Sequence, residues 1–199
     1  MARRALVRRL APLIVPLLAL VLHATPHAAA LLQFDRAALA HGQLWRLLTG
    51  HLVHFSTEHL LWDIGAFTLL GLLLPPLPLR HWVSLLGGAA LVISAGVWLL
   101  QPQFVLYRGL SGIDCALFGA VLVTRLRVAR RERDRAARAG IALVNLGFLG
   151  KCAYELRTAA AVFVAGTDFT PVPLAHLLGA AAGALLATSP LSPAAETDC

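Results

Sequence analysis

The segment Tyr107–Ala120, which reads YRGLSGIDCALFGA, decides how the rest of the chain is interpreted. It starts with Gly109 and Gly112 on either side of Ser111 and continues as an apolar run interrupted by Asp114. The pattern predicts a membrane helix opened by Ser111, whose hydroxyl then lies near backbone N–H groups without intrahelical partners. Those donors and the positive helix end favour negative charge. A nucleophile beside an oxyanion hole fits this position, and so does a serine that merely caps the helix.

The composition is that of an integral membrane protein. Of the 199 residues, 58% are hydrophobic and only 14% are charged, and the mean hydropathy is +0.74. The chain is too apolar for a soluble surface and suits one domain of several helices. The net charge of +7 does not indicate a nucleic-acid partner, because the arginines flank apolar segments. The three cysteines form neither a disulfide framework nor a metal-binding pattern, so we expect no metal and no cofactor.

The apolar segments predict an all-α bundle of six transmembrane helices with both termini in the cytoplasm. Residues 1–9 form a cytoplasmic arm, residues 10–188 the membrane domain and residues 189–199 a cytoplasmic tail. The six expected spans are residues 10–32, 59–74, 82–100, 111–124, 141–165 and 174–187. Residues 125–138 contain seven arginines, which places this loop in the cytoplasm by the positive-inside rule.

In this topology the second, fourth and sixth spans all begin at the outer face. Near that end they carry His59 and Asp63, Ser111, and His176, respectively. Polar and ionisable side chains inside a membrane usually face the protein interior or a water-filled cavity. We therefore expect these side chains to lie at one depth and to meet.

Small residues predict close packing of the fourth and sixth spans. Gly179 and Gly183 lie three and seven residues after His176, so all three share one helix face. The fourth span offers a similar stripe, consisting of Gly112, Ala116 and Gly119. Small residues let helices approach closely, which would place His176 opposite Ser111. The alternative is a generic small-residue helix pair that buries a hydrogen-bonded histidine.

A serine and a histidine in contact form a nucleophile and its general base. The imidazole takes the hydroxyl proton and later returns it to the leaving amine. The backbone N–H of Ser111 and the side chain of His59 are candidate donors to the oxyanion. No acid is obviously placed in the sequence to orient His176, which favours a dyad over a triad.

These residues resemble the rhomboid family of intramembrane serine proteases. The resemblance extends from Trp45 to Ala187 and is carried by the segments WR at 45–46, HFSTEHLLWD at 54–63, GLSG at 109–112 and AHLLG at 175–179. It implies a six-helix rhomboid-like bundle in which Ser111 is the nucleophile and His176 its base.

By the same resemblance, His59 and the position of Asp63 help to bind the oxyanion, and Gly109 and Gly112 support the nucleophile. Rhomboids usually have Asn where this chain has Asp63. An ionised carboxylate cannot donate a hydrogen bond to an oxyanion. Asp63 would have to be protonated, or it would pair with His59 instead.

The resemblance implies an endopeptidase that cleaves single-span membrane proteins near the outer face of a bacterial inner membrane. The small build is similar to rhombosortases, which are associated with C-terminal Gly-Gly sorting signals. The partners would be such substrates and the lipid bilayer, and the oligomeric state stays open. The alternatives are a proteolytically inactive rhomboid-like protein that binds membrane helices, and a transporter, for which the sequence shows no inverted repeat.

Two charged residues interrupt the predicted fifth span. Lys151 and Glu155 are one turn apart on one face, so they are expected to pair and reduce the insertion penalty of each charge. By the resemblance, this span borders the lateral entrance for substrate. The pair is therefore either structural or a substrate-recognition element.

Overall fold

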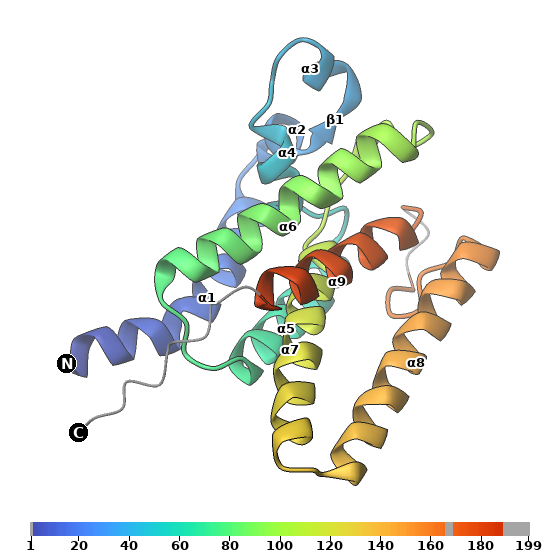
Figure 1. Cartoon of the computed structure of the whole chain (residues 1–199). Helices are drawn as coiled ribbons and strands as arrows, with labels where there is room; N and C mark the ends of the chain where they lie inside the picture. The colour runs from blue at the N-terminus through green and yellow to red at the C-terminus, as the bar shows by residue number, and fades with distance from the viewer. Residues whose placement is uncertain (1, 166–168, 189–199) are drawn as a thin grey trace.

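Helix α7 (Ser111–Arg131), which begins at the serine of the opening segment, lies at the centre of a helical bundle (Figure 1). The computed structural model describes residues 2–165 and 169–188. The long helices packed around α7 are α5 (Thr57–Leu73), α6 (Leu79–Leu100), α8 (Arg135–Thr158) and α9 (Pro173–Thr188), and α1 (Ala2–Ala24) packs against α5. The predicted tail at 189–199 and residues 166–168, between the predicted fifth and sixth spans, lie outside the described residues.

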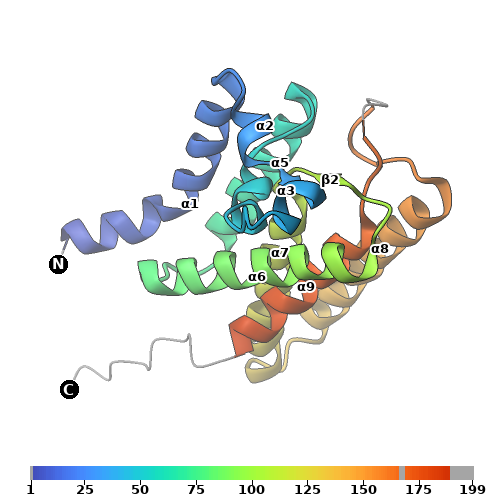
Figure 2. The ribbon, with the colours of Figure 1, turned by 90° about the horizontal axis from the view of Figure 1, so that it is seen from above.

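Helices α7 and α9 pack so closely that their contact has no room for a side chain at several glycines. A Cβ atom at Gly179 would overlap the carbonyl oxygen of Gly112, and one at Gly183 would overlap that of Ala116. The predicted close packing of these two helices is therefore confirmed. Helix α6 packs against α9 and also against α7 (Figure 2), so α9 contacts both helices.

Short elements between α1 and α5 fold over the end of the bundle at which α7 begins. They are α2 (Ala28–Leu32), β1 (Phe34–Asp35), α3 (Arg36–Ala40), α4 (Arg46–Thr49) and the 3₁₀ helix η1 (Gly50–Leu52). Strand β1 pairs antiparallel with β2 (Leu106–Tyr107), the strand that leads into α7. The Arg46 guanidinium donates to the carbonyls of Ala30 and Gln33 at 3.0 and 2.8 Å. These bonds hold α4 against α2 and the residue that leads into β1.

Two predicted helix boundaries were wrong. The first apolar segment does not form one helix over 10–32, because Pro26 provides no N–H donor and His27 adopts a left-handed φ of 62°; α1 ends at Ala24 and α2 follows. The fifth predicted span does not continue to residue 165, because α8 ends at Thr158 and Ala159 has a φ of 55°. Residues 159–165 instead turn back along α8.

The arginine-rich segment is mostly helix rather than loop. Helix α7 continues through Arg131, and α8 begins at Arg135 with Asp134 as its N-cap. Arg125 donates to the carbonyl of Leu73 at the end of α5, and Arg127 to those of Ala187 and Thr188 at the end of α9. Cations are favourable at helix C-termini, so these arginines join the ends of three helices.

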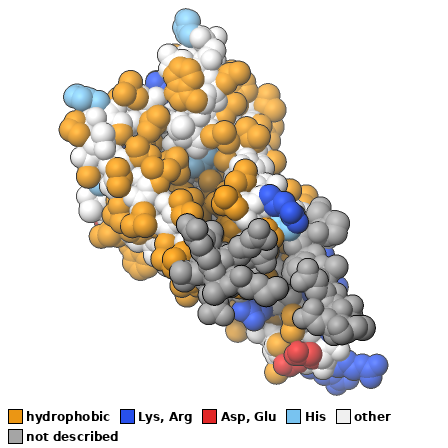
Figure 3. Space-filling model, turned by 90° about the vertical axis from the view of Figure 1, so that its left-hand side faces the viewer, with side chains coloured by type: hydrophobic (Ala, Val, Ile, Leu, Met, Phe, Trp, Pro, Cys, Tyr) orange, Lys and Arg blue, Asp and Glu red, His pale blue; other side chains and the backbone are white. Residues whose placement is uncertain are grey.

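Much of the surface of the bundle is apolar. Large hydrophobic side chains on α8 are widely exposed, among them Leu143, Leu146 and Leu156. In Figure 3 hydrophobic side chains cover most of the visible face, and Lys and Arg side chains gather mainly at its lower end. Among the described helices, α6 alone is long and apolar enough throughout to cross a membrane by length and composition, with a mean hydropathy of 2.1; α5 and α9 are shorter, with 17 and 16 residues.

Candidate active site

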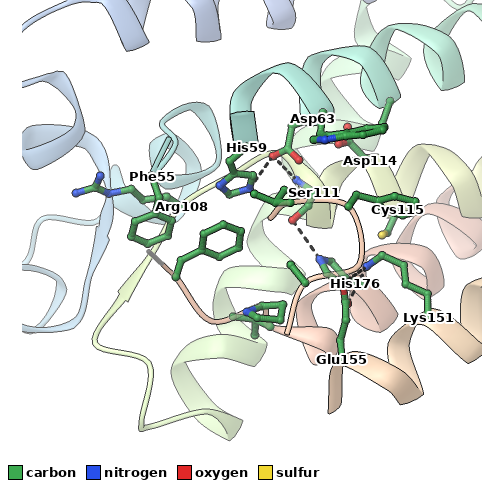
Figure 4. A pocket seen from close by; sticks show the side chains of 18 of the residues that line it. Phe55, His59, Asp63, Arg108, Ser111, Asp114, Cys115, Lys151, Glu155 and His176 are labelled. Carbon is green, nitrogen blue, oxygen red and sulfur yellow. Dashed lines mark hydrogen bonds and ion pairs between the residues drawn. The ribbon is translucent and has the colours of Figure 1, made fainter. Parts of the chain in front are cut away.

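Ser111 and His176 lie in direct contact. Ser111 is the first residue of α7, and His176 lies in the first turn of α9. The Nε2 atom of His176 is 3.1 Å from the Oγ atom of Ser111 (Figure 4). This separation is within hydrogen-bond range, and it follows from the glycine contact between the two helices one turn further along.

The carboxylate of Asp63 occupies the backbone donors next to the serine. Its Oδ2 atom accepts hydrogen bonds from the N–H groups of Leu110 and Ser111 at 2.8 and 3.1 Å. The Nε2 atoms of His54 and His59 lie 3.1 and 3.2 Å from the same oxygen. One carboxylate oxygen therefore stands where the expected oxyanion donors converge.

His54 was missed as a site residue in the sequence. It lies in the extended segment before α5, nine residues before Asp63, so no helical spacing connects the two. Burial lowers the pKa of His54, and the Asp63 carboxylate opposes this shift. The Nε2 atom of His54 lies 3.1 Å from Oδ2 of Asp63, and the backbone N–H of Leu110 points at the same nitrogen at 3.4 Å.

Gly109 and Gly112 allow the close approaches at the start of α7. Gly109 has a φ of +117°, and a Cβ atom there would lie 2.7 Å from the His59 ring. A side chain at this position would be strained and would push His59 away from Asp63. A Cβ atom at Gly112 would lie 3.0 Å from the Tyr107 hydroxyl and 3.1 Å from Ile93, so the absence of a side chain lets the start of α7 lie close to β2 and α6.

Lys151 and Glu155 extend the site to α8. The predicted pairing is confirmed, with Lys151 Nζ 2.8 and 2.7 Å from the two oxygens of Glu155. The structure also shows a contact that the sequence analysis missed, because Glu155 Oε2 lies 3.2 Å from Nδ1 of His176. Lys151 Nζ lies 3.3 Å from the same nitrogen. An acid is therefore placed beside His176, contrary to the sequence-based expectation, since only the packing of α8 against α9 brings the two together.

A cavity of about 920 Å³ opens in front of Ser111. Its walls come from α5, α7, α8 and the segments that precede α7 and α9. The lining is mainly apolar and includes the aromatic side chains of Phe55, Trp62, Phe148, Phe163 and Phe169. Ser111, His176 and Asp114 line the same cavity. A large apolar cavity with a few convergent polar groups is the usual form of a binding site.

The described residues contain no group of three or more His, Cys, Asp or Glu side chains arranged to hold a metal ion. Cys115 and Cys152 are free thiols. The arrangement supports acid–base and nucleophilic chemistry at one hydroxyl, with a histidine base and nearby backbone donors.

Comparison with known proteins identifies the family. A family model of the rhomboid domain matches residues 41–192, which is most of the chain and includes every site residue described above. No curated protein matches the chain in sequence. The family is one of membrane proteins and intramembrane serine proteases, and its model covers the start of α5, the start of α7 and all of the described α9. The chain therefore belongs to the rhomboid family.

Proposed function

We propose that this protein is an intramembrane serine endopeptidase. The contact between Ser111 Oγ and His176 Nε2, at 3.1 Å, is the observation that carries the proposal. Ser111 attacks the scissile carbonyl carbon while His176 takes its proton. The protonated imidazole then returns this proton to the leaving amine, and water repeats the sequence on the acyl-enzyme.

The tetrahedral intermediate needs donors that Asp63 occupies in this structure. The N–H groups of Leu110 and Ser111 and the side chain of His59 point at one place, which suits a developing oxyanion. For catalysis the Asp63 carboxyl withdraws from these donors or is protonated. Gly109 and Gly112 support the site because they let α7 begin close to its neighbours.

The proposed topology has six spans, formed by α1, α5, α6, α7, α8 and α9, with both termini in the cytoplasm. The exposed apolar side chains of α8 then face lipid, and the arginines between α7 and α8 lie in the cytoplasm. Ser111 is at the start of α7 and His176 is in the first turn of α9. The arginines are at the other end of α7. This supports a site towards the outer face.

The proposed substrates are single-span membrane proteins. The apolar cavity in front of Ser111 suits an unwound apolar segment better than a soluble polar peptide. The small rhomboid domain supports a rhombosortase-like role in a bacterial inner membrane, the processing of C-terminal Gly-Gly sorting signals.

A second candidate function is a proteolytically inactive rhomboid-like protein that binds membrane helices. One observation favours it: the Asp63 carboxylate fills the donor site beside Ser111. A fixed negative charge there would repel an oxyanion and prevent acylation.

Labelling by a serine-directed fluorophosphonate distinguishes the two candidates. The protein is purified in detergent, incubated with the probe, and compared with Ser111→Ala. Labelling of the wild-type protein that is lost in the variant supports the protease, as does cleavage of a single-span substrate in reconstituted vesicles. A folded wild-type protein that neither labels nor cleaves over pH 5–9 supports the inactive binder instead.

A further inference from the structure

We propose that Glu155 is a positioning residue for His176, so that this rhomboid domain acts through a Ser–His–Glu triad. The inference rests on the proposed function and extends it to a third side chain. Glu155 Oε2 lies 3.2 Å from Nδ1 of His176, while Nε2 of the same ring faces Ser111 at 3.1 Å. The three groups form a line from α8 through α9 to α7 (Figure 4).

The carboxylate decides which ring nitrogen of His176 carries the proton. A neutral imidazole has one N–H and one lone pair. When Nδ1–H donates to Glu155, the lone pair lies on Nε2, where it can accept the proton of Ser111. When the ring takes that proton, the imidazolium is stabilised by the adjacent carboxylate, as in other Ser–His–acid sites.

Lys151 cannot replace Glu155 in this role. Its Nζ atom is 3.3 Å from Nδ1, but an ammonium group has no acceptor. A hydrogen bond from Lys151 to Nδ1 would place the ring proton on Nε2, which is the wrong tautomer for a base. Of the two groups, only Glu155 can hold the productive tautomer.

Glu155 is held in a fixed position from several sides. Its side chain is only 2% exposed. Lys151 binds both carboxylate oxygens at 2.7–2.8 Å, and the backbone N–H of Val162 donates to Oε1 at 3.3 Å. The second contact exists because α8 ends at Thr158 and the chain turns back along it. Lys151 also balances the charge of the carboxylate, which reduces the penalty of burying it.

Few other titratable groups of the described residues face His176. Asp114 and Cys115 of α7 and His59 and Asp63 of α5 line the same cavity. Helix α6 also packs against α9, but Gly96 lies against Leu178 and Gly88 against Leu186. Arg80 and His81, at the start of α6, are therefore at the end of α9 that is remote from His176. Within residues 2–165 and 169–188, Lys151 and Glu155 are the charged groups in contact with the ring.

The test compares Glu155→Gln with Glu132→Gln, a matched change at an exposed position in the turn between α7 and α8. The readouts are kcat on a single-span substrate, its pH profile, the rate of fluorophosphonate labelling and the melting temperature. We expect Glu155→Gln to lower kcat and the labelling rate by about 10²-fold or more, given the 10⁴-fold effect of losing a triad acid elsewhere. In Glu155→Gln, the acidic pH at which kcat begins to fall should move to lower pH. The reason is that the His176 imidazolium is no longer stabilised by the Glu155 carboxylate. Glu132→Gln should match the wild-type protein.

Lys151→Met gives a shift of the opposite sign. Without the ammonium group, the Glu155 charge acts on His176 unopposed, so the pH below which activity falls should move to higher pH, and the melting temperature should fall because the buried carboxylate loses its counter-charge. If Glu155→Gln does not fold, the double variant Lys151→Met with Glu155→Leu replaces the pair by apolar side chains and avoids a lone buried charge. It should fold and show the same loss of labelling.

Three results would overturn the inference. Wild-type kcat and pH profile in Glu155→Gln would exclude a positioning role. A loss on the single-span substrate with a normal labelling rate would assign Glu155 to substrate recognition. A lower melting temperature with an unchanged pH profile would assign it to stability. In each case the wild-type protein still labels at Ser111, whereas failure of the proposed function removes labelling from the wild-type protein itself.

Discussion

The backbone N–H of Ser111 donates a hydrogen bond to Oδ2 of Asp63 at 3.1 Å. The same oxygen accepts from the N–H of Leu110 at 2.8 Å. The group that a serine protease needs for its oxyanion is therefore already bound to a carboxylate. A buried carboxylate with several donors is well satisfied, so a substrate carbonyl has to compete with it.

Replacing Asp63 by Asn should raise activity at neutral pH. An amide can donate to an oxyanion at every pH, whereas a carboxyl donates only when protonated. We expect about a tenfold gain in labelling rate or kcat, which corresponds to about 1.4 kcal/mol. The ratio of the variant rate to the wild-type rate should increase with pH, because the protonated fraction of a carboxyl falls as pH rises. Inactivity of Asp63→Asn at all pH values would show that the negative charge is required.

Loss of either member of the Ser–His pair should abolish cleavage without unfolding the protein. Ser111→Ala and His176→Ala each remove one side of the 3.1 Å contact, and the double variant should be no less active than either single variant, because the pair acts as a unit. Ser84→Ala and His41→Ala change exposed residues and serve as controls. Substantial cleavage by either single variant would contradict the assignment.

The contact between α7 and α9 should tolerate no side chain at Gly183. A Cβ atom there would overlap the carbonyl oxygen of Ala116, so Gly183→Ala should destabilise the protein by about 1–3 kcal/mol and separate His176 from Ser111. The matched control is Gly147→Ala on α8, where a Cβ atom would meet nothing within 4 Å. That change should be neutral or slightly stabilising. Thermal unfolding in detergent measures both, and equal melting temperatures would refute the packing argument.

Stability should fall on acidification below pH 6.5. Burial lowers the pKa of His51 from 6.5 to about 4, against the opposing effect of its hydrogen bond to the Ala90 carbonyl. The unfolded chain therefore binds a proton between these pH values that the folded protein does not, so the contribution is complete above pH 6.5 and is lost towards pH 4. The expected loss is about 3 kcal/mol.

His51→Asn tests this source of acid sensitivity. The variant should be less stable at pH 7.5, because it loses the 3.0 Å contact with Ser94, but its melting temperature should fall less between pH 7.5 and 4.5. Part of the acid loss should remain, since burial also lowers the pKa of His54. An identical acid decline in both proteins would exclude His51 as the cause.

Local patterns in the sequence were enough to predict the helical architecture and the meeting of Ser111 with His176. The stripe of small residues on each helix specifies their contact, and side chains four residues apart on one helix must be neighbours. That spacing explains why the Asp63–His59 and Lys151–Glu155 contacts were foreseeable. Both kinds of inference depend only on the geometry of a helix and on steric size.

Contacts between separate elements required the tertiary structure. The approach of Glu155 to His176 depends on how α8 packs against α9, and no periodicity connects residues on two such helices. His54 reaches Asp63 from an extended segment, whose path depends on the short elements folded around it. The end of α8 at Thr158 could not be predicted from the sequence, because residues 159–165 are as apolar as a helix core. The left-handed φ of Ala159 in the structure shows where the helix stops.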